Sequence, residues 1–251
     1  MTHYSKTRIV LGLLVAVLRP GVASASTLDH PADQAVRLPA PPAPPPDPLP
    51  PPEVIPGGIS EEVWHHALSA LKEAAVEGKS TRPVLTVIDY SRPATEKRLW
   101  VVDAIDHHLL ATDYVAHGYG SGDAVEATRF SNRDDSHESS LGTFVTGEVF
   151  YGVRGRSLPL IGLEPGINDN AYQRGLLIHG TPTVSAARAS KGTQGVTEGC
   201  AGVPSASAKR LIKLIGAGSV VFVWYPDPLL LAKSEFLDHQ EVGERLAGTM
   251  E

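Results

Sequence analysis

The spacing of apolar residues predicts one amphipathic helix ahead of a long stretch of extended character. Ser60 can cap the first turn of this helix, and Glu61 and Glu62 suit its positive end. Gly78 is expected to end it. The apolar residues in between recur on one helical face: Val63, Ala67, Leu68, Leu71 and Ala75.

Two adjacent histidines, His65 and His66, lie within this predicted helix. Neighbouring residues are about 100° apart around a helix axis, so the two rings cannot both face one metal ion. We expect them at the surface.

From Pro83 onward the pattern changes to short β-branched or aromatic runs, separated by Gly, Pro, Asn, Asp and Ser. These runs predict a mainly β domain. The predicted strands cover residues 84–89, 98–103, 109–117, 143–151, 175–179 and 220–225.

One helix is predicted inside the β domain, with Ser205 as its cap and Gly216 at its end. Its apolar face is formed by Ala208, Leu211, Ile212 and Ile215. The segment after Pro226 is at most weakly helical by its pattern. We therefore place the domain at residues 59–226 and a C-terminal tail at 227–251.

The first 25 residues have the three-part layout of a secretory signal. Lys6 and Arg8 precede an apolar run over residues 9–18, and the small residues Ala23-Ser24-Ala25 follow. The run is shorter than the roughly 20 residues of a membrane span. The pattern predicts a cleaved signal peptide at 1–25, no stable membrane span after cleavage, and export to the periplasm or cell envelope. Arg19, just after the run, leaves an uncleaved short anchor as the alternative.

Residues 26–58 are predicted to be a Pro-rich, disordered linker. Proline dominates positions 39–56, and it fixes φ and removes the amide donor, which favours extended polyproline II. A spacer is the expected role. A ligand for a proline-recognising module is the alternative, which the export signal disfavours.

Composition and charge exclude one class of partner. The 251 residues are 42% hydrophobic, enough for the core of one ordinary domain, and the net charge is −6. Removal of residues 1–25 takes away three basic residues (Lys6, Arg8 and Arg19) and no acid, so 19 basic and 28 acidic residues remain, a net charge of −9. This balance argues against a nucleic-acid partner.

Cys200 is the only cysteine, and it lies in the run Thr197-Glu198-Gly199-Cys200. A lone thiol in an exported protein cannot form an internal disulfide, which makes it a candidate nucleophile. The small residues on both sides of it would let a substrate carbonyl approach and backbone amides stabilise an oxyanion.

A catalytic thiol needs a base or cation beside it, because at its reference pKa of about 8.5 only a few per cent is thiolate at neutral pH. His179 is the candidate base, since it ends an apolar run and Gly180 allows close backbone approach. The alternatives are a small buried thiol and a hydrogen-bonded core histidine. Spacing alone does not bring the two side chains together.

Other candidate sites are weaker. The glycine-rich residues 118–122 predict a tight turn rather than a phosphate loop, because no Lys-Ser or Lys-Thr pair follows. There is no H-E-x-x-H and no cysteine pair, so no metal site is predicted. His107 and His108 fall on a turn and a strand, and His137 in a polar loop. His117 ends a predicted strand and is a candidate to line the same cleft as Cys200.

The pair His179-Gly180 and Thr197-Glu198-Gly199-Cys200 resembles the signature of the YkuD-type L,D-transpeptidases. Further short motifs resemble those of the murein L,D-transpeptidase branch of that family, and the similarity covers roughly residues 83–225. These motifs are Asp89-Tyr90-Ser91-Arg92-Pro93, Lys97-Arg98-Leu99, Ala116-His117-Gly118, Arg129-Phe130-Ser131-Asn132, Ser139-Ser140-Leu141-Gly142, Gly162-Leu163-Glu164-Pro165-Gly166 and Asn168-Asp169-Asn170.

The resemblance implies a β-sandwich catalytic domain with one or two peripheral helices, and a cysteine acyl-enzyme that needs no cofactor. Cys200 would attack the carbonyl of the third residue of a peptidoglycan tetrapeptide stem and release D-alanine. His179 would carry the proton, with its ring oriented by the Gly180 carbonyl. An amine of a neighbouring stem would then take the acyl group, giving a 3→3 cross-link. Carbapenems are the inhibitor class that the resemblance implies.

The same resemblance assigns supporting roles. The amides of Gly199 and Cys200 would hold the oxyanion, and Thr197 would align the nucleophile loop. Substrate-binding candidates are His117, Arg129 and Asn132.

The sequence departs from the family pattern beside the thiol. Glu198 stands where many members have His or Arg, and Ala201-Gly202 where many have a hydrophobic residue followed by Arg or Asn. Glu198 is expected to point outward, because an inward acid would disfavour the thiolate. An L,D-carboxypeptidase with the same site, and a wall-binding module without catalysis, are the alternatives.

Overall fold

The computed structural model describes residues 55–237. The first helix is α1 (Glu61–Val76), and the Ser60 hydroxyl caps it by accepting from the Val63 amide at 3.4 Å, as predicted. The chain leaves the helix at Gly78, where φ is +67°. The buried face consists of Val63, Trp64, His66, Ala67, Ala70 and Ala74.

Two expectations for α1 are wrong. Ala75 is exposed rather than part of the apolar face. His66 is not at the surface: it is 1% exposed, and its ring stacks on Trp224 with 4.8 Å between ring centroids. The cause is tertiary, because α1 packs against the strand that contains Trp224.

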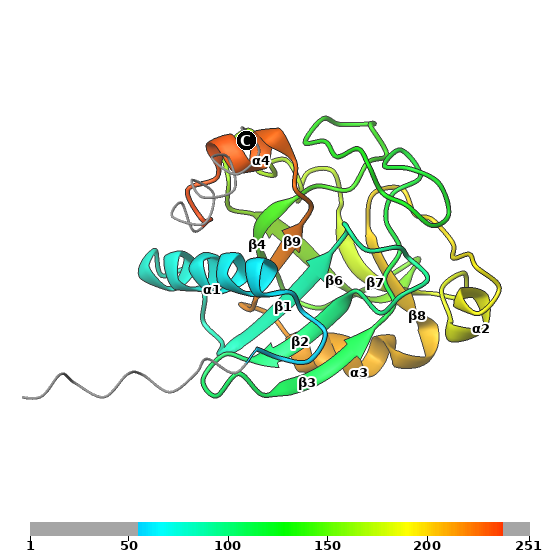
Figure 1. The fold of residues 1–251 in the computed structure, drawn as a ribbon, viewed down its shortest axis with the longest axis horizontal. Helices are drawn as coiled ribbons and strands as arrows, with labels where there is room; N and C mark the ends of the chain where they lie inside the picture. Colours follow the sequence, from blue (N-terminus) through cyan, green and yellow to red (C-terminus); the bar gives the residue numbers. More distant parts are fainter. Residues whose placement is uncertain (1–54, 238–251) are drawn as a thin grey trace, which may run out of the picture. The chain divides into compact units, whose positions relative to one another are not determined.

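Nine strands form the sheet, in the spatial order β3-β2-β1-β9-β4-β6-β7-β8, with β5 paired to β6 (Figure 1). The pairs β1–β9 and β7–β8 are parallel, and the other strand pairs are antiparallel. In chain order the strands are β1 (Val84–Asp89), β2 (Leu99–Asp103), β3 (Leu109–Asp113), β4 (Gly142–Thr146), β5 (Phe150–Gly152), β6 (Gly155–Gly162), β7 (Leu177–Thr181), β8 (Ala201–Pro204) and β9 (Val220–Trp224).

The long strand β6 joins two parts of the sheet. Its end pairs with β4, and its middle pairs with β7, where Ser157 is opposite His179. A bridge between Ala116 and Gly202 ties the chain after β3 to β8 at the other end of the strand order. The domain is therefore mainly β, as predicted, with its strands wrapped around a core.

The predicted strands need four corrections. The run 143–151 is broken into β4 and β5, and the run 109–117 is regular only as far as Asp113. β6 was not predicted, because Pro159 lies in its middle and glycines stand at both ends. β8 was not predicted either, because it has only four residues and begins with two small ones, Ala201 and Gly202.

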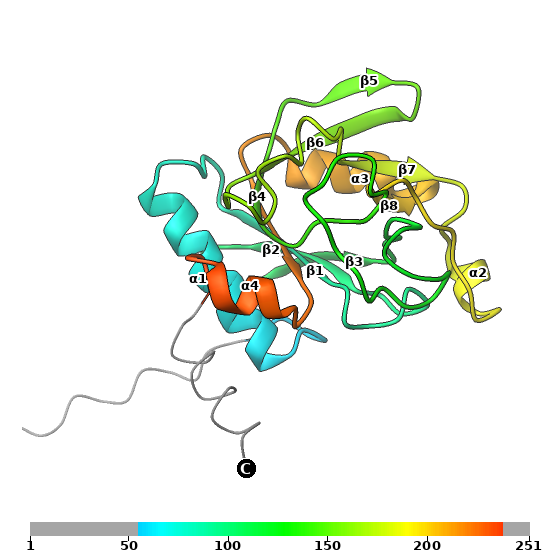
Figure 2. The same ribbon diagram turned by 90° about the horizontal axis from the view of Figure 1, so that it is seen from above.

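The other helices are α2 (Ala186–Ala189), α3 (Ser205–Ile215) and α4 (Pro228–Lys233). In α3 the predicted apolar face is buried, and Gly216 ends the helix with φ +65°. Ser205 is not its cap: the N-cap is Pro204, without a side-chain hydrogen bond, and Ser205 is the first helical residue. α3 packs on β7, β6, β8 and β1, whereas α1 packs on β9 and β1 (Figure 2).

The folded part of the chain extends beyond residues 59–226 at both ends. The Trp100 indole donates to the Gly57 carbonyl at 3.2 Å. After Tyr225, Asp227 caps α4, and Leu230, Phe236 and Leu237 belong to the core. Part of the segment assigned to a tail is thus core structure, because its apolar residues contribute to the main cluster.

The predicted signal peptide at 1–25, most of the predicted linker and the end of the tail lie outside the described residues. Within residues 55–237, no helix has both the length and the apolar character needed to cross a membrane.

A pair of neighbouring leucines tests the role of α4. Leu230 is 1% exposed, whereas Leu229 is 45% exposed. We expect Leu230→Ala to lower the free energy of unfolding by about 2–5 kcal/mol, and Leu229→Ala by no more than about 0.5 kcal/mol. Urea unfolding followed by tryptophan fluorescence measures both. Equal effects would show that α4 does not share the core.

Candidate active site

The parallel pairing of β7 with β8 positions the two candidate catalytic residues. Ile178 is opposite Ala201, and His179 is opposite Gly202. Cys200 immediately precedes β8, which places it level with Leu177, two residues before His179. Side chains two residues apart on a strand share a face. The register therefore puts the thiol and the imidazole on one face of neighbouring chains.

The Cys200 side chain is buried, with the residue 5% exposed. Its thiol donates to the Gly175 carbonyl at 3.6 Å. Burial raises the pKa of Cys200, and Glu198 adds to this effect; the Leu177 amide and the charges of Arg154 and Arg174 lower the pKa but do not outweigh burial. The resting group is thus a thiol, which needs a base to become a nucleophile.

His179 has one ring nitrogen bound and one available. Nδ1 donates to the Gly180 carbonyl at 3.0 Å, and this bond fixes the tautomer. Nε2 therefore carries the lone pair, and it is buried without a hydrogen-bond partner. Burial lowers the pKa of His179. The hydrogen bond to the Gly180 carbonyl raises this pKa, and the charge of Arg154 lowers it, so that the net shift is downward. The neutral ring is favoured, which is the form that can accept a proton.

Gly180 is required by the packing of α3. A Cβ at this position would lie 2.9 Å from the Ala208 Cβ, closer than real contacts allow. The predicted close backbone approach is confirmed, and it brings the carbonyl that holds His179 against the helix.

The loop before Cys200 is held by its own hydrogen bonds. The Thr197 hydroxyl donates to the Cys200 carbonyl at 2.7 Å and accepts from the Gly199 amide at 3.2 Å. The Gly199 amide is thus engaged in this conformation, contrary to the expectation that it is free for an oxyanion. The Ser139 hydroxyl donates to the Gly199 carbonyl at 3.0 Å, and φ of Gly199 is +113°.

Of the three expected substrate-binding residues, only His117 is buried, whereas Arg129 is exposed and Asn132 is half-buried. His117 is fully buried: Arg98 donates to its Nδ1 at 2.7 Å, and its Nε2 donates to the Asp123 carbonyl at 2.8 Å. Arg129 donates to the Gly120 carbonyl at 3.0 Å. Asn132 donates to Asp169 at 2.6 Å.

His117 therefore does not line the cleft. It acts through its backbone, because its carbonyl accepts from the Thr197 amide at 2.9 Å and so supports the nucleophile loop. The glycine-rich residues 118–122 around Ser121 form the predicted turn, in which the Ser121 amide donates to the Gly118 carbonyl at 2.8 Å.

Arg174 is a site residue that the sequence reasoning missed. Its guanidinium donates to the Ser140 hydroxyl at 2.7 Å, the Ser136 hydroxyl at 2.9 Å and the Glu138 carbonyl at 2.7 Å. It directly precedes Gly175, whose carbonyl contacts the thiol. Its only sequence signal was a cation next to the glycine that opens a predicted strand.

Glu198 points outward, as expected, and forms an ion pair with Arg154 at 2.8 Å. Arg154 lies in the turn of the β5–β6 hairpin, so the pair ties this hairpin to the nucleophile loop. Both side chains are partly exposed. The sequence motif did not indicate the partner, which lies 44 residues away.

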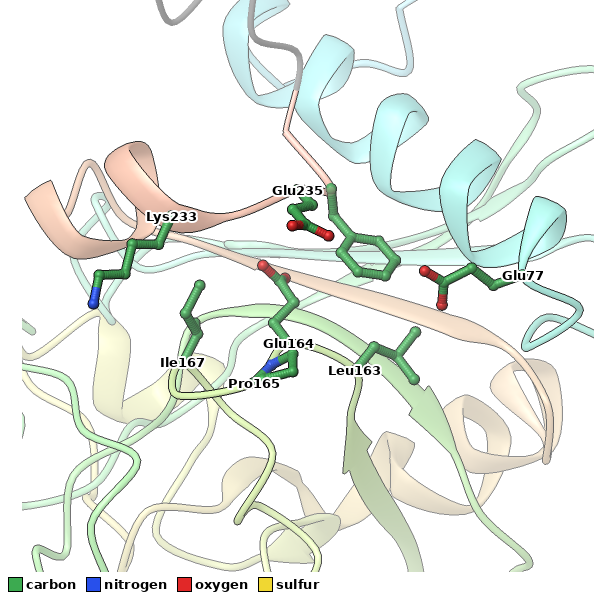
Figure 3. A pocket seen from close by; sticks show the side chains of 8 residues that line it. Glu77, Leu163, Glu164, Pro165, Ile167, Lys233 and Glu235 are labelled. Carbon is green, nitrogen blue, oxygen red and sulfur yellow. The ribbon is translucent and has the colours of Figure 1, made fainter.

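A groove of about 630 Å³ lies along β6 and the start of β7; Cys200 does not line it, but Gly175, whose carbonyl accepts from the thiol, does. Gly175 and Leu177 form part of its lining. A second cavity of about 310 Å³ lies between the end of α1 and the segment after α4 (Figure 3). Glu164 extends into that cavity near Glu235, and none of the predicted site residues lines it. Within residues 55–237, no three His, Cys, Asp or Glu side chains are placed to share a metal ion.

Comparison with protein families identifies the class of protein to which this chain belongs. The family described as "L,D-transpeptidase catalytic domain" matches residues 56–224. The chain belongs to this family, which agrees with the resemblance in its motifs. No sequence among curated proteins is significantly similar to the chain.

Solved structures of L,D-transpeptidases are among the structural matches. An L,D-transpeptidase from Mycobacterium smegmatis has 14% identity and a TM-score of 0.35, with 57% of this chain and 59% of that chain covered. L,D-transpeptidase 3 from Mycobacterium tuberculosis has 12% identity and a TM-score of 0.36, with 57% and 61% covered. The helical cell shape determining protein Pgp2 from Campylobacter jejuni has 12% identity and a TM-score of 0.39, with 71% and 60% covered. The matched part thus spans about three fifths of each of those chains, and the family assignment rests on the family match.

The buried His117 should make folding sensitive to acid. Burial and the Arg98 charge lower the pKa of His117 from 6.5 to about 4. Between these values the unfolded chain binds a proton that the folded chain does not, so the free energy of unfolding falls as pH drops from 6.5 towards 4. The loss should reach about 3 kcal/mol. In His117→Gln this contribution is absent, which urea unfolding at a series of pH values detects. If the free energy of unfolding depended on pH in the same way in both proteins, the assignment of this acid sensitivity to His117 would be wrong.

The Arg154–Glu198 pair should adjust the reactivity of the thiol in opposite directions. Arg154→Gln removes a charge that lowers the pKa of Cys200, whereas Glu198→Gln removes one that raises it. We expect slower alkylation by iodoacetamide at neutral pH in the first variant and faster alkylation in the second. Each change should be less than about tenfold, because the pair is exposed. Lys213→Gln on α3 is the charge control. Acceleration in both variants would show that the pair acts by restricting access instead.

Proposed function

We propose that this chain is a cysteine-dependent peptidoglycan L,D-transpeptidase, with Cys200 as the nucleophile and His179 as the general base. One observation carries the proposal: Nδ1 of His179 is bound to the Gly180 carbonyl, Nε2 is left buried without a partner, and the β7–β8 register puts this ring on the same face as the Cys200 thiol. A neutral imidazole in this tautomer can accept the proton that a thiol must lose.

In the acylation half-reaction, the thiol leaves the Gly175 carbonyl and gives its proton to Nε2 of His179. The sulfur attacks the carbonyl carbon of the third stem residue, and the electron pair moves to the carbonyl oxygen. When the tetrahedral intermediate collapses, the bond to the terminal D-alanine breaks, and the departing amine takes the proton from the imidazolium. The product is a thioester on Cys200.

In the second half-reaction, an amine of a neighbouring stem attacks the thioester and passes its proton to Nε2. The carbon–sulfur bond breaks, the sulfur regains the proton from His179, and a 3→3 cross-link is formed. With water in place of the amine, the same steps yield a tripeptide, which is the carboxypeptidase outcome. No cofactor takes part in this scheme.

The proposed location follows from the substrate. Peptidoglycan lies outside the cytoplasmic membrane, and the sequence pattern of residues 1–25 is that of an export signal. We propose that the catalytic domain acts in the periplasm or cell envelope.

The proposal is tested with purified stem tetrapeptides and with a carbapenem. Cys200→Ala should abolish turnover and the covalent carbapenem adduct, detected by intact mass. His179→Gln should lower turnover by about 10²- to 10⁴-fold. His108→Gln is the matched control and should be unaffected, since His108 lies in the turn between β2 and β3, at the opposite end of the strand order from β7 and β8.

The products distinguish the alternatives. Cross-linked dimers identify a transpeptidase, and tripeptides alone identify a carboxypeptidase. Sacculus binding without any product or adduct, unchanged in Cys200→Ala, would refute the enzyme and leave a wall-binding module.

A further inference from the structure

The cavity between the end of α1 and the segment after α4 is separate from the candidate active site. Its volume is about 310 Å³, and none of the proposed catalytic residues lines it. The lining comes from three parts of the chain that the fold brings together (Figure 3). These parts are Glu77 at the end of α1, residues within 163–167 after β6, and residues within 233–236 after α4.

Glu164 is the buried acid of this cavity. The residue is 2% exposed; its Oε1 accepts from the Thr143 amide at 2.5 Å, and its Oε2 is buried without a hydrogen-bond partner. Burial raises the pKa of Glu164, and the charge of Glu235 adds to this effect; the Ser234 hydroxyl and the Thr143 amide and hydroxyl lower the pKa but do not outweigh burial. An unpaired polar atom in the interior costs free energy. A cation at Oε2 offsets that cost.

Two further acids make the cavity anionic. Glu77 and Glu235 line it and are exposed, and the ion pairs found within residues 55–237 involve neither of them. Lys233 is the single cation of the lining, and Figure 3 shows its ammonium group directed away from Glu164. The last turn of α1, beside Glu77, contains no basic residue, so the negative end of this helix is not compensated there. The surroundings therefore favour a bound cation.

The walls of the cavity indicate which kind of cation fits. Within the part of the chain that the structure describes, no three acidic side chains are placed to share a metal ion. The other lining residues are apolar: Leu163, Pro165, Ile167 and Phe236. Apolar walls complement methylene groups, and Phe236 also offers an aromatic face to an ammonium group. An organic amine therefore matches this lining better than a metal ion.

The acids lie on two sides of the cavity. Figure 3 shows the carboxylates of Glu164 and Glu235 directed at one another, whereas Glu77 reaches in from the end of α1. We propose that this cavity binds a linear aliphatic diamine, with one ammonium group at Glu164 and Glu235 and the other at Glu77. The methylene groups between them contact the apolar walls. The site does not include Cys200, so the proposal goes beyond the proposed function and does not depend on it.

The test compares 1,4-diaminobutane with 1-aminobutane, which has the same chain and one ammonium group fewer. An NMR titration of the full-length protein measures the two dissociation constants, including weak ones. We expect the diamine to bind about two- to fivefold more tightly, the range of one additional exposed ion pair. High salt should reduce this preference. The diamine should also raise the midpoint of thermal unfolding, because it binds the folded state.

Variants assign the binding to the cavity. Glu77→Gln should bring the two dissociation constants together, whereas Glu73→Gln, which removes the same charge elsewhere on α1, should keep them apart. Glu235→Gln should weaken both amines. Glu164→Gln should weaken both as well, and it keeps an oxygen that can accept from the Thr143 amide. Because Glu77 and Glu235 are exposed, their variants test the site even if the Glu164 variant does not fold.

Four results would overturn the proposal. They are no binding of 1,4-diaminobutane, equal binding of the two amines to the unmodified protein, an undiminished preference in Glu77→Gln, and displacement of the diamine by equimolar Ca²⁺, which would identify a metal site instead. Turnover of stem peptides and formation of the carbapenem adduct are measured separately. The diamine site can therefore fail while the proposed function stands, and the reverse is also possible.

Discussion

The parallel pairing of β7 with β8 is the constraint on which the candidate site depends. It fixes His179 opposite Gly202 and brings the residue before β8, Cys200, onto the same face. Parallel neighbours need a crossover between them. Here 19 residues separate the two strands and include the short helix α2. The pairing is held from outside by α3, whose Ala208 packs so close to Gly180 that no side chain fits there.

Burial disfavours the charged forms of both Cys200 and His179. The thiol is disfavoured as an anion by burial, and the imidazole is disfavoured as a cation for the same reason. Both groups therefore rest in their neutral forms. In the proposed reaction, charge separation between them arises only when the proton is transferred, and Arg154 and Arg174 lower the pKa of the thiol.

Much of the buried polar structure supports the site without entering it. Arg98 and His117 lie behind the nucleophile loop, and the loop is bound to the His117 carbonyl and the Ser139 hydroxyl. Arg174 joins the chain before β7 to residues 131–140 in the same way. These contacts explain why His117, a ligand candidate in the sequence, serves as a support in the structure. A polar residue that must satisfy backbone groups in the interior cannot also face a substrate.

The sequence by itself determined the local features: the Ser60-capped helix, the buried face of α3, most core strands and the motif around Cys200. Local periodicity and turn chemistry carry that information. Only the tertiary structure decided the rest. The burial of His66, the pairing of β6 with two partners, the inclusion of α4 in the core, and the contacts of Arg174 and Arg154 all depend on residues far apart in the chain. Long-range contacts leave no local pattern, because the partner that satisfies or buries a side chain is chosen by packing.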